Sequence, residues 1–401
     1  MRNHVDGSGG LSRRTALAAG LGVTVGVANG LLGTPVARAD DGPSARSRAK
    51  FAHRAQDTYA ALLRHYYDPA TSFFLEEFPR TGGNPWSYVW PFSQALIGTQ
   101  LLSGIPGIGG RYRDDLADRY TALEAYWNRE TTPPGYDSYL RPPLGQGGDK
   151  FYDDNEWLAL AFLQRHYLTP GGDRAAIRRA AEIFDLLVFG WDTDPTHPLP
   201  GGVFWTQAPW SNDRNTVSNA PGAEVGLHLY LLTGRRYYLD WATRMYDWVR
   251  TNMLAPNGLY WDHVDLAGVI EQTQWTYNQG VMIGAGALLY RATGRRAYLE
   301  HALDTATRAL AYYAEEDRYF TQPRFTAILF ANLLLLSTVV PNPVYRATLE
   351  WFADESRRRF RDPATGIYHF FPGSVSLLEQ SAMIRVEAML AWDRADYRKL
   401  T

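Results

Sequence analysis

Two consecutive carboxylates, Asp153 and Asp154, lie where a loop gives way to the apolar run 158–163. Oxygen-bearing side chains just before such a run are typical of a helix start, because they accept hydrogen bonds from unpaired first-turn N–H groups. A capping role is therefore one interpretation. A chemical one is retaining glycoside hydrolysis, which needs a nucleophile and an acid/base with carboxyl groups about 5–5.5 Å apart. Neighbouring helical side chains diverge by about 100°, but at a helix entry the first aspartate can still be non-helical, which would let both carboxylates approach one small ligand.

The surroundings of the pair add to the chemical interpretation. The upstream loop 132–150 is rich in Pro, Gly and Tyr, an unusual amount of aromatic surface for a connector, and Phe151, Tyr152 and Trp157 flank the carboxylates. Aromatic faces stack on flat apolar ligands such as sugar rings, and they also fill protein cores. Composition alone leaves both uses open.

The elements that must position the pair are helices. Apolar residues at helical spacing predict helices at 52–67, 91–102 and 111–130. Residues 233–239 recur as 293–299, an offset of 293 − 233 = 60. In each copy an apolar helix ends at Thr-Gly, with the glycine as its C-cap. Repeats of two helices must bury their faces against neighbouring repeats.

The loops indicate how the repeats are arranged. Long aromatic loops precede alternate helices, at 201–219, at 254–275 and before Asp153, which puts them at one common end. An open solenoid needs polar capping repeats, and none is evident. The sequence therefore predicts an all-α closed toroid of helical hairpins with a cleft at its mouth.

The N-terminus has the features of an export signal. Residues 12–17 read Ser-Arg-Arg-Thr-Ala-Leu, a weakly apolar stretch follows at 18–32, and Ala37-Arg38-Ala39 resembles a cleavage site. The apolar stretch is shorter than the roughly 20 residues that span a membrane, which disfavours a retained anchor. We expect a twin-arginine signal peptide at 1–39, one domain at 40–401 and a secreted protein without a stable membrane span. The absence of cysteine suits a protein that needs no disulfide outside the cell.

Composition excludes several function classes. The net charge of −2 over 401 residues argues against nucleic acid as a partner, since phosphate binding needs a strongly basic face. The nine histidines show no metal-ligand spacing, so we predict no metal site, and no phosphate-binding loop or nucleophile elbow is present. We expect no cofactor. With no evident linker or second domain, a monomer is the default expectation.

The motifs in chain order resemble a known family. Residues 152–157, Tyr-Asp-Asp-Asn-Glu-Trp, resemble the catalytic signature of glycoside hydrolase family 76, the endo-acting α-1,6-mannanases. Residues 201–205, 215–219, 275–280 and 293–294 resemble its glycine-rich aromatic loop, its Asn-x-x-Ser-Asn segment, its Tyr-Asn-Gln-Gly segment and its repeat turn. The similarity covers roughly residues 50–310. It implies an (α/α)6 barrel and a retaining mechanism, with Asp153 as nucleophile and Asp154 as general acid/base.

The resemblance also suggests which residues contact the sugar. Tyr and Trp stack on sugar faces, and Asn and Gln bind hydroxyls, but the same residues serve as helix caps and core. The predicted substrate-binding residues are Tyr152, Asn155, Trp205, Asn219, Trp275, Tyr277, Asn278 and Gln279. Two places depart from the family pattern: Arg324-Phe325-Thr326-Ala327-Ile328 stands where Phe-Lys-Gly-Ile is typical, so the lysine is absent, and Arg214 stands where a lysine is common.

These observations predict an exported glycoside hydrolase that cleaves α-1,6-mannosidic bonds within a mannan-like polysaccharide. One alternative is an (α/α)6 hydrolase that acts on another α-linked glycan. A second is a non-catalytic carbohydrate-binding or scaffold toroid. The intact aspartate pair speaks against the second alternative, because a protein without turnover has no reason to hold two repelling carboxylates together.

Overall fold

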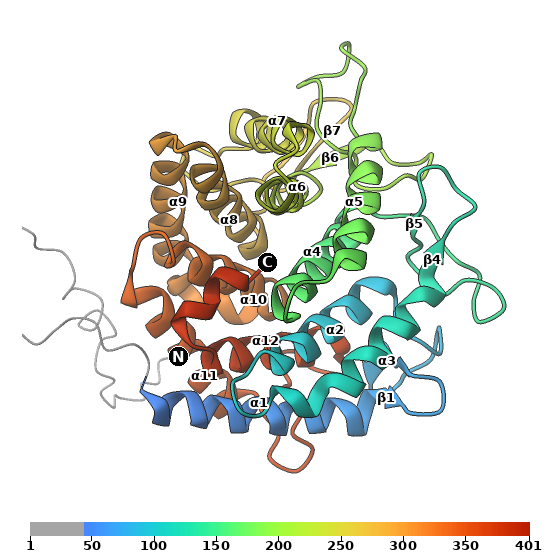
Figure 1. The fold of residues 1–401 in the computed structure, drawn as a ribbon, viewed down its shortest axis with the longest axis vertical. Helices are drawn as coiled ribbons and strands as arrows, with labels where there is room; N and C mark the ends of the chain where they lie inside the picture. Colours follow the sequence, from blue (N-terminus) through green and yellow to red (C-terminus); the bar gives the residue numbers. More distant parts are fainter. Residues whose placement is uncertain (1–43) are drawn as a thin grey trace, which may run out of the picture. The chain divides into compact units, whose positions relative to one another are not determined.

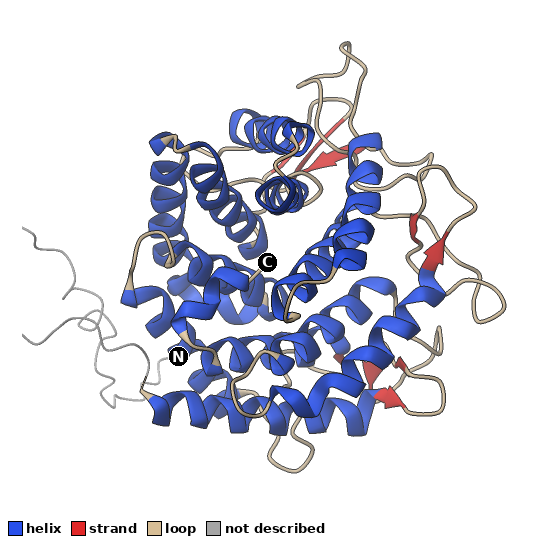
Figure 2. Ribbon diagram, viewed as in Figure 1, coloured by secondary structure: helices blue, strands red, loops and turns tan. Residues whose placement is uncertain are grey.

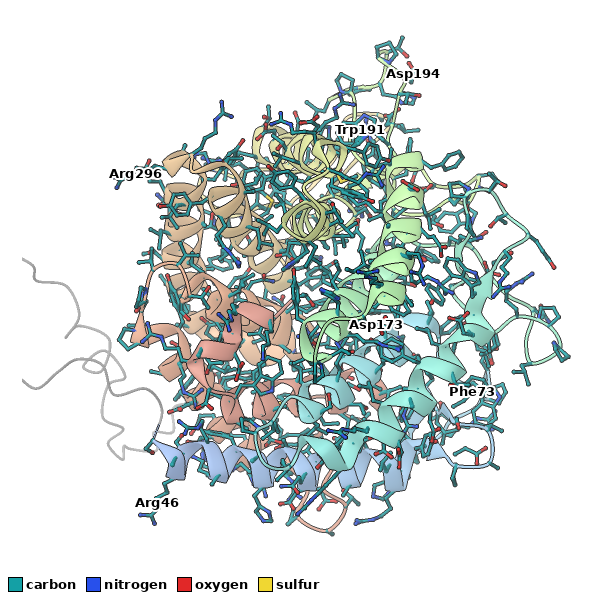
Figure 3. The ribbon with its side chains drawn as sticks, viewed as in Figure 1. Arg46, Phe73, Asp173, Trp191, Asp194 and Arg296 are labelled. Carbon is teal, nitrogen blue, oxygen red and sulfur yellow. The ribbon has the colours of Figure 1, made fainter. Side chains whose placement is uncertain are left out.

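The computed structural model describes residues 44–401, and helices dominate them (Figures 1 and 2). The predicted signal peptide at 1–39 lies outside the described residues. Among the helices that are described, none combines the length and the hydropathy that a membrane span requires. Side chains fill the spaces between the ribbons (Figure 3).

Within residues 44–401, six helices form an inner ring. Each packs against the next, and the last packs against the first, so the ring closes as the sequence predicts (Figure 1). Their residues are buried on nearly every side, which explains why they lack a polar face. The inner helices are α2 (Val89–Ser103), α4 (Tyr152–Leu168), α6 (Ala220–Thr233), α8 (Thr276–Thr293), α10 (Pro323–Leu336) and α12 (Leu377–Ala391).

Six outer helices cover the ring and bury one stripe each. They are α1 (Ala45–Tyr66), α3 (Arg113–Leu123), α5 (Arg174–Phe189), α7 (Arg236–Asn252), α9 (Arg296–Ala314) and α11 (Pro343–Arg359). Short 3₁₀ helices complete the described chain at η3 (Gly109–Tyr112), η4 (Glu124–Tyr126), η5 (Glu315–Thr321) and η6 (Arg394–Lys399). Because outer and inner helices alternate along the chain, all inner helices run in one direction and their N-termini share one end.

Helix boundaries differ from the sequence-based ranges because caps and turns, not periodicity, set them. α1 begins at Ala45, before the predicted residue 52, and the Ser44 side chain caps it. α2 begins at Val89, so Pro91 lies in its first turn, where a missing N–H costs no helical bond. α3 ends at Leu123 instead of 130. The repeat turn is confirmed, since Gly234 and Gly294 both adopt φ 72° and cap α6 and α8.

Short antiparallel strands tie together the loops that precede the inner helices. One sheet joins the first of these loops to the last (β3 with β9), and another joins the loops before α6 and α8 (β6 with β7 and β8). The strands are β1 (Tyr67–Asp68), β2 (Phe73–Phe74), β3 (Glu77–Phe78), β4 (Trp127–Asn128), β5 (Gly135–Tyr136), β6 (Asp213–Asn215), β7 (His263–Asp265), β8 (Ile270–Glu271) and β9 (Val375–Ser376). The mouth of the barrel is therefore a connected rim of loops.

A repeated hydrogen-bond pattern fixes three of these loops to the barrel. Gln279 in the first turns of α8 accepts from the Tyr260 N–H at 2.7 Å and donates to the Tyr260 and Trp275 carbonyls at 2.9 and 3.0 Å. Asn155 binds the backbone of Tyr136 in the same way, and Asn219 binds that of Val203. Each of the two also donates to the carbonyl four residues before it. We call these three side chains the amide clamps.

Candidate active site

The aspartate pair lies in the first turn of α4. The helix begins at Tyr152, so Asp153 and Asp154 are both helical, and the non-helical conformation that a helix entry allows for the first of them is not adopted. Because these residues are in the first turn, no helical turn of α4 precedes them to cover their side chains. Both carboxyl groups can therefore reach the mouth of the barrel although they diverge. Both residues are half-buried. The charge of Asp153 acts on Asp154, so the two groups remain close.

Hydrogen bonding distinguishes the two carboxyl groups. Burial raises the pKa of Asp153 to about 7, while hydrogen bonds from the backbone and from the Trp205 side chain stabilise its ionised form. Burial raises the pKa of Asp154 well above its usual range, and the charges of Asp153 and Glu76 raise it further. Of the two groups Asp153 therefore loses its proton more readily, so when the pair carries a single charge that charge is on Asp153 and the remaining proton is on Asp154.

Two further carboxylates act on the pair, and the sequence analysis did not single out either. Glu76 follows β2, and its Oε2 accepts a hydrogen bond from the Tyr88 N–H at 2.9 Å. Asp262 directly precedes β7, accepts from the Asn278 amide at 3.3 Å, and lies 3.0 Å from the ring of His263. Its charge raises the pKa of the Asp153 carboxyl, although burial is the larger cause. The only signal for both was their place in aromatic loops at the common end.

Aromatic side chains predicted to bind sugar gather beside the pair. Burial and nearby carboxylates, Asp153 among them, raise the pKa of the Tyr277 hydroxyl well above its usual range. The Tyr277 ring stacks on Phe325 with 4.1 Å between centroids, and Trp275 meets the same ring edge-on at 5.4 Å. Trp205 is 36% exposed and packs edge-on against Phe151. The structure thus brings Trp205, Trp275, Tyr277 and Asn278 toward the aspartates.

Four other predicted sugar-binding residues lie elsewhere. Asn155, Asn219 and Gln279 are fully buried, and their amides hold loop backbone as the clamps described above. The Tyr152 ring lies against Gly190, at the end of α5, where a Cβ on the glycine would come within 2.4 Å of it. In this structure the polar contacts of the three amides are with loop backbone, and the Tyr152 ring packs at the end of α5.

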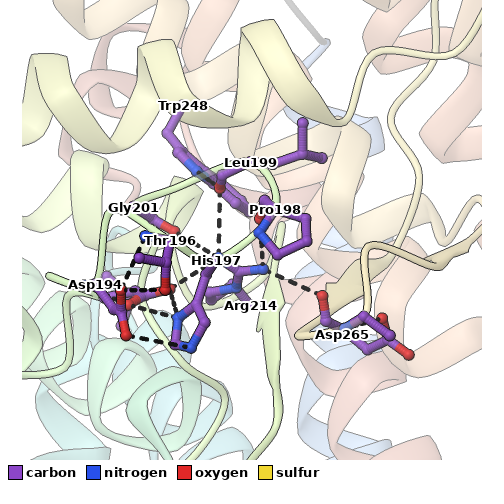
Figure 4. Close-up of polar contacts among 12 residues, drawn as sticks. Asp194, Thr196, His197, Pro198, Leu199, Gly201, Arg214, Trp248 and Asp265 are labelled. Atoms are coloured by element: carbon purple, nitrogen blue, oxygen red, sulfur yellow. Dashed lines mark hydrogen bonds and ion pairs between the residues drawn. The ribbon is translucent and has the colours of Figure 1, made fainter.

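A buried arginine, Arg214, positions the loop that carries Trp205, and its contacts with Pro198, Leu199 and Asp265 are drawn in Figure 4. The fully buried Arg214 in β6 binds Asp192 at 2.8 Å. Its guanidinium also donates to the carbonyls of Pro198, Leu199 and Asp265, at 3.0, 3.3 and 3.2 Å. A lysine has no planar fork to reach several loops at once, so the family departure at this position serves loop packing.

The floor below the pair is also acidic. Glu156 and Glu224 are buried inside the ring, and burial raises the pKa of each well above its usual range. Gly284 makes room for this layer: a Cβ there would come within 1.9 Å of the Glu224 and Asn332 oxygens. Burial therefore favours the protonated, uncharged form of both glutamates.

The donor set does not suggest a metal centre. Within the described residues, no three His, Asp or Glu side chains are grouped as ligands for an ion. The site instead offers two carboxyl groups of unequal acidity, hydrogen-bonding side chains and aromatic faces.

Residues 50–366 match the profile of glycosyl hydrolase family 76. The chain belongs to this family. The resemblance seen in the sequence is thereby confirmed. Family 76 structures also share the fold: the mannosidase of Bacteroides thetaiotaomicron superposes with a TM-score of 0.75 at 20% identity, over 85% of this chain and 98% of that one. The (α/α)6 prediction is correct.

Two other sets of family 76 proteins are informative. The α-1,6-mannanase of Salegentibacter sp. superposes with a TM-score of 0.68 at 22% identity, over 85% of this chain and 99% of that one. An inactive variant of it, with two consecutive aspartates replaced, was solved with α-1,6-mannotriose. Among curated relatives, mannan endo-1,6-alpha-mannosidase DCW1 of Candida glabrata is 32% identical over 181 residues, and that of Saccharomyces cerevisiae 30% over 165. These matches cover 41% and 38% of this chain and 40% and 36% of the relatives.

Proposed function

We propose that this protein is a retaining endo-α-1,6-mannanase. The observation that carries the proposal is the unequal environment of the adjacent Asp153 and Asp154 at the barrel mouth, in which Asp153 gives up its proton more readily than Asp154. Family membership and the names of the fungal and bacterial relatives support the choice of linkage. The inactive Salegentibacter variant supports the choice of residues, since it too involves two adjacent aspartates.

The proposed reaction has two steps. The Asp153 carboxylate attacks the anomeric carbon, while Asp154 gives its proton to the departing glycosidic oxygen, so that a covalent mannosyl–enzyme ester forms. In the second step Asp154 takes a proton from water, whose oxygen attacks the anomeric carbon and releases Asp153. Two inversions retain the α configuration. The Trp205 side chain lowers the pKa of Asp153 and so favours its carboxylate before attack and again when it leaves.

The neighbouring side chains supply the contacts for the sugar. Tyr277, Trp275 and the exposed face of Trp205 offer aromatic surfaces beside the pair. Asp262 and Asn278 form a hydrogen-bonded pair in the same region, suited to the hydroxyl groups of mannose. Aromatic stacking combined with such polar groups is typical of sites that recognise flat sugar faces.

The test compares linear α-1,6-mannan with an aryl α-mannoside that has a good leaving group. Asp153→Asn removes the nucleophile and should abolish turnover of both. Asp154→Asn should lower turnover of mannan by about 10²–10⁴-fold, as expected for loss of a general acid, and affect the aryl mannoside much less in its first step. Azide should rescue this variant and yield an α-mannosyl azide.

Asp118→Asn, an exposed aspartate on α3, is the matched control and should behave as the wild type. Products with inverted configuration, or full mannan turnover by Asp153→Asn, would show that the assigned roles are wrong.

We further propose that the protein is exported through the twin-arginine signal at 12–17 and acts as a monomer. Mass spectrometry of protein recovered outside the cell should give an N-terminus at Asp40, and replacing Arg13 and Arg14 by Lys should stop export. Light scattering of the purified protein should give the mass of one chain. An unprocessed N-terminus, or a dimer, would contradict the respective proposal.

A further inference from the structure

A cavity lies at the end of the barrel opposite to the aspartates. It has a volume of about 300 Å³ and opens where α4, α6 and α8 end. Tyr167 on its wall follows Asp153 along α4 by 14 residues, which places it about 21 Å away along the helix axis. The cavity is lined by Tyr167, His228, Leu231, Leu232, Arg291, Arg398 and Lys399.

The charge of this lining is one-sided. Three of its side chains are cations, and none is a carboxylate. Within residues 44–401, Lys399 has an ion pair with Asp396 at 2.7 Å, whereas Arg291 and Arg398 have no ion-pair partner. Arg291 lies in the last turn of α8, where the helix dipole favours a cation. That explains one arginine but not the convergence of all three.

A buried histidine supplies an independent observation. His228 is 2% exposed, and its Nδ1 lies 3.0 Å from the Tyr167 hydroxyl. Burial, aided by Arg291, lowers the pKa of His228 to about 3, so the ring is neutral. When the Tyr167 hydroxyl donates to Nδ1, the ring proton is on Nε2. That Nε2 is buried and has no hydrogen-bond partner among the described residues, so a residue that lines the cavity has an N–H donor without an acceptor.

We propose that this cavity binds a phosphate monoester. Cationic side chains and a neutral N–H donor together match an oxyanion with several acceptor oxygens. The volume exceeds that of a single ion, and Leu231, Leu232 and the Tyr167 ring provide an apolar wall for the organic group of the ester. The site is separate from the aspartate pair, so the proposal stands independently of the catalytic roles assigned above.

The experiment measures binding of inorganic phosphate, mannose 6-phosphate and mannose to the full chain by calorimetry at low salt. Both phosphates should bind and mannose should not. Tighter binding of the sugar phosphate identifies an ester as the ligand, and equal or weaker binding than inorganic phosphate overturns the assignment to an ester. Ring ¹⁵N resonances of His228 should shift on binding, which localises the ligand.

Arg291→Gln should weaken binding of mannose 6-phosphate by about tenfold or more, as expected for loss of a charge-assisted hydrogen bond. Arg291 is exposed, so the variant should fold. Arg296→Gln is the matched control: Arg296 begins α9 at the same end of the barrel, does not line the cavity, and points outward in Figure 3. No binding, an equal loss in both variants, or binding that leaves the His228 resonances unchanged would overturn the proposal.

Discussion

Replacing Gln279 by Glu distinguishes the two parts that this residue could play. As a sugar-binding residue, which the sequence analysis predicted, it would affect the Michaelis constant and leave stability unchanged. As an amide clamp, it accepts from the Tyr260 N–H and donates to two carbonyls. Glu keeps the size of the side chain and its acceptor oxygen. It loses both donors and brings a carboxylate toward the carbonyls of Tyr260 and Trp275.

The magnitude follows from the bonds that are lost. Two donated hydrogen bonds contribute about 1 kcal/mol each, and two carbonyls left unpaired beside a buried carboxyl group raise the total to about 3–5 kcal/mol. For the described residues, 44–401, the usual entropy of unfolding is about 0.75 kcal/mol per kelvin. The expected decrease in Tm is therefore about 4–7 °C.

The loss should depend on pH in one direction. In the folded variant, burial raises the pKa of the new carboxyl group, whereas in the unfolded chain its pKa is about 4.3. Unfolding therefore releases a proton above that pH, and the variant becomes less stable relative to the wild type as pH rises. At pH 4.5 the carboxyl group keeps its proton and donates one of the lost bonds, so the difference should be smaller than at pH 8.

The assay is reversible chemical denaturation at both pH values, with kinetics on mannan measured in parallel. Gln272→Glu is the control, because Gln272 is exposed in the same loop and the same charge change there should alter stability by less than about 0.5 kcal/mol. A Gln279→Glu variant as stable as the wild type at pH 8, but with a raised Michaelis constant, would refute the clamp.

Three more substitutions test features of the site. Arg214→Lys should cost about 1–3 kcal/mol of stability by calorimetry, since a lysine cannot keep both the Asp192 ion pair and the loop carbonyls; unchanged stability would argue against the loop-packing role. Trp205→Phe should raise the pKa of Asp153, which moves the acidic limb of the kcat/KM profile on mannan to higher pH and lowers activity at low pH by about tenfold. A shift of that limb to lower pH would contradict the role of Trp205. Gly284→Ala should lower stability by about 1–3 kcal/mol or more, because the new Cβ meets buried carboxyl and amide oxygens. Gly110→Ala is the control, since nothing lies within 4 Å of its Cβ, and an equal loss of stability in both variants would exclude the packing explanation.

Much of the fold could be predicted because it rests on local signals. The Thr-Gly turns at 233–234 and 293–294 require a left-handed glycine, and their spacing of 60 residues reports the hairpin repeat. Long loops before alternate helices indicate that these loops share one end of the barrel, and this inference does not depend on the exact residues at which the helices begin. The boundaries were less accurate, since α2 starts at Val89, two residues before the proline that seemed to open it.

The site was harder to predict because its chemistry depends on long-range contacts. A carboxylate such as Glu76 carries no local sign that it lies near Asp154, since the path of a loop brings them together. For the amide side chains the sequence analysis made the opposite mistake: it assigned sugar binding to residues whose amides hold loop backbone. An Asn or Gln near a helix start has the same spacing whether it faces the cleft or the preceding loop, and only the position of the Tyr260 backbone shows that Gln279 faces the loop.

The amide clamps have a consequence for how this surface can change. Each holds its loop through both the main-chain N–H and the C=O of one residue, and every amino acid other than proline supplies both groups. The three held residues are Tyr136, Val203 and Tyr260, so the attachment makes no demand on the side chain. Loop length and composition on either side of the held residue are thus free to diverge while the barrel stays intact. The barrel can therefore hold loops of different sequence at the same three positions. Exchanging loop segments between homologues at these positions is a route to enzymes with new glycan preferences.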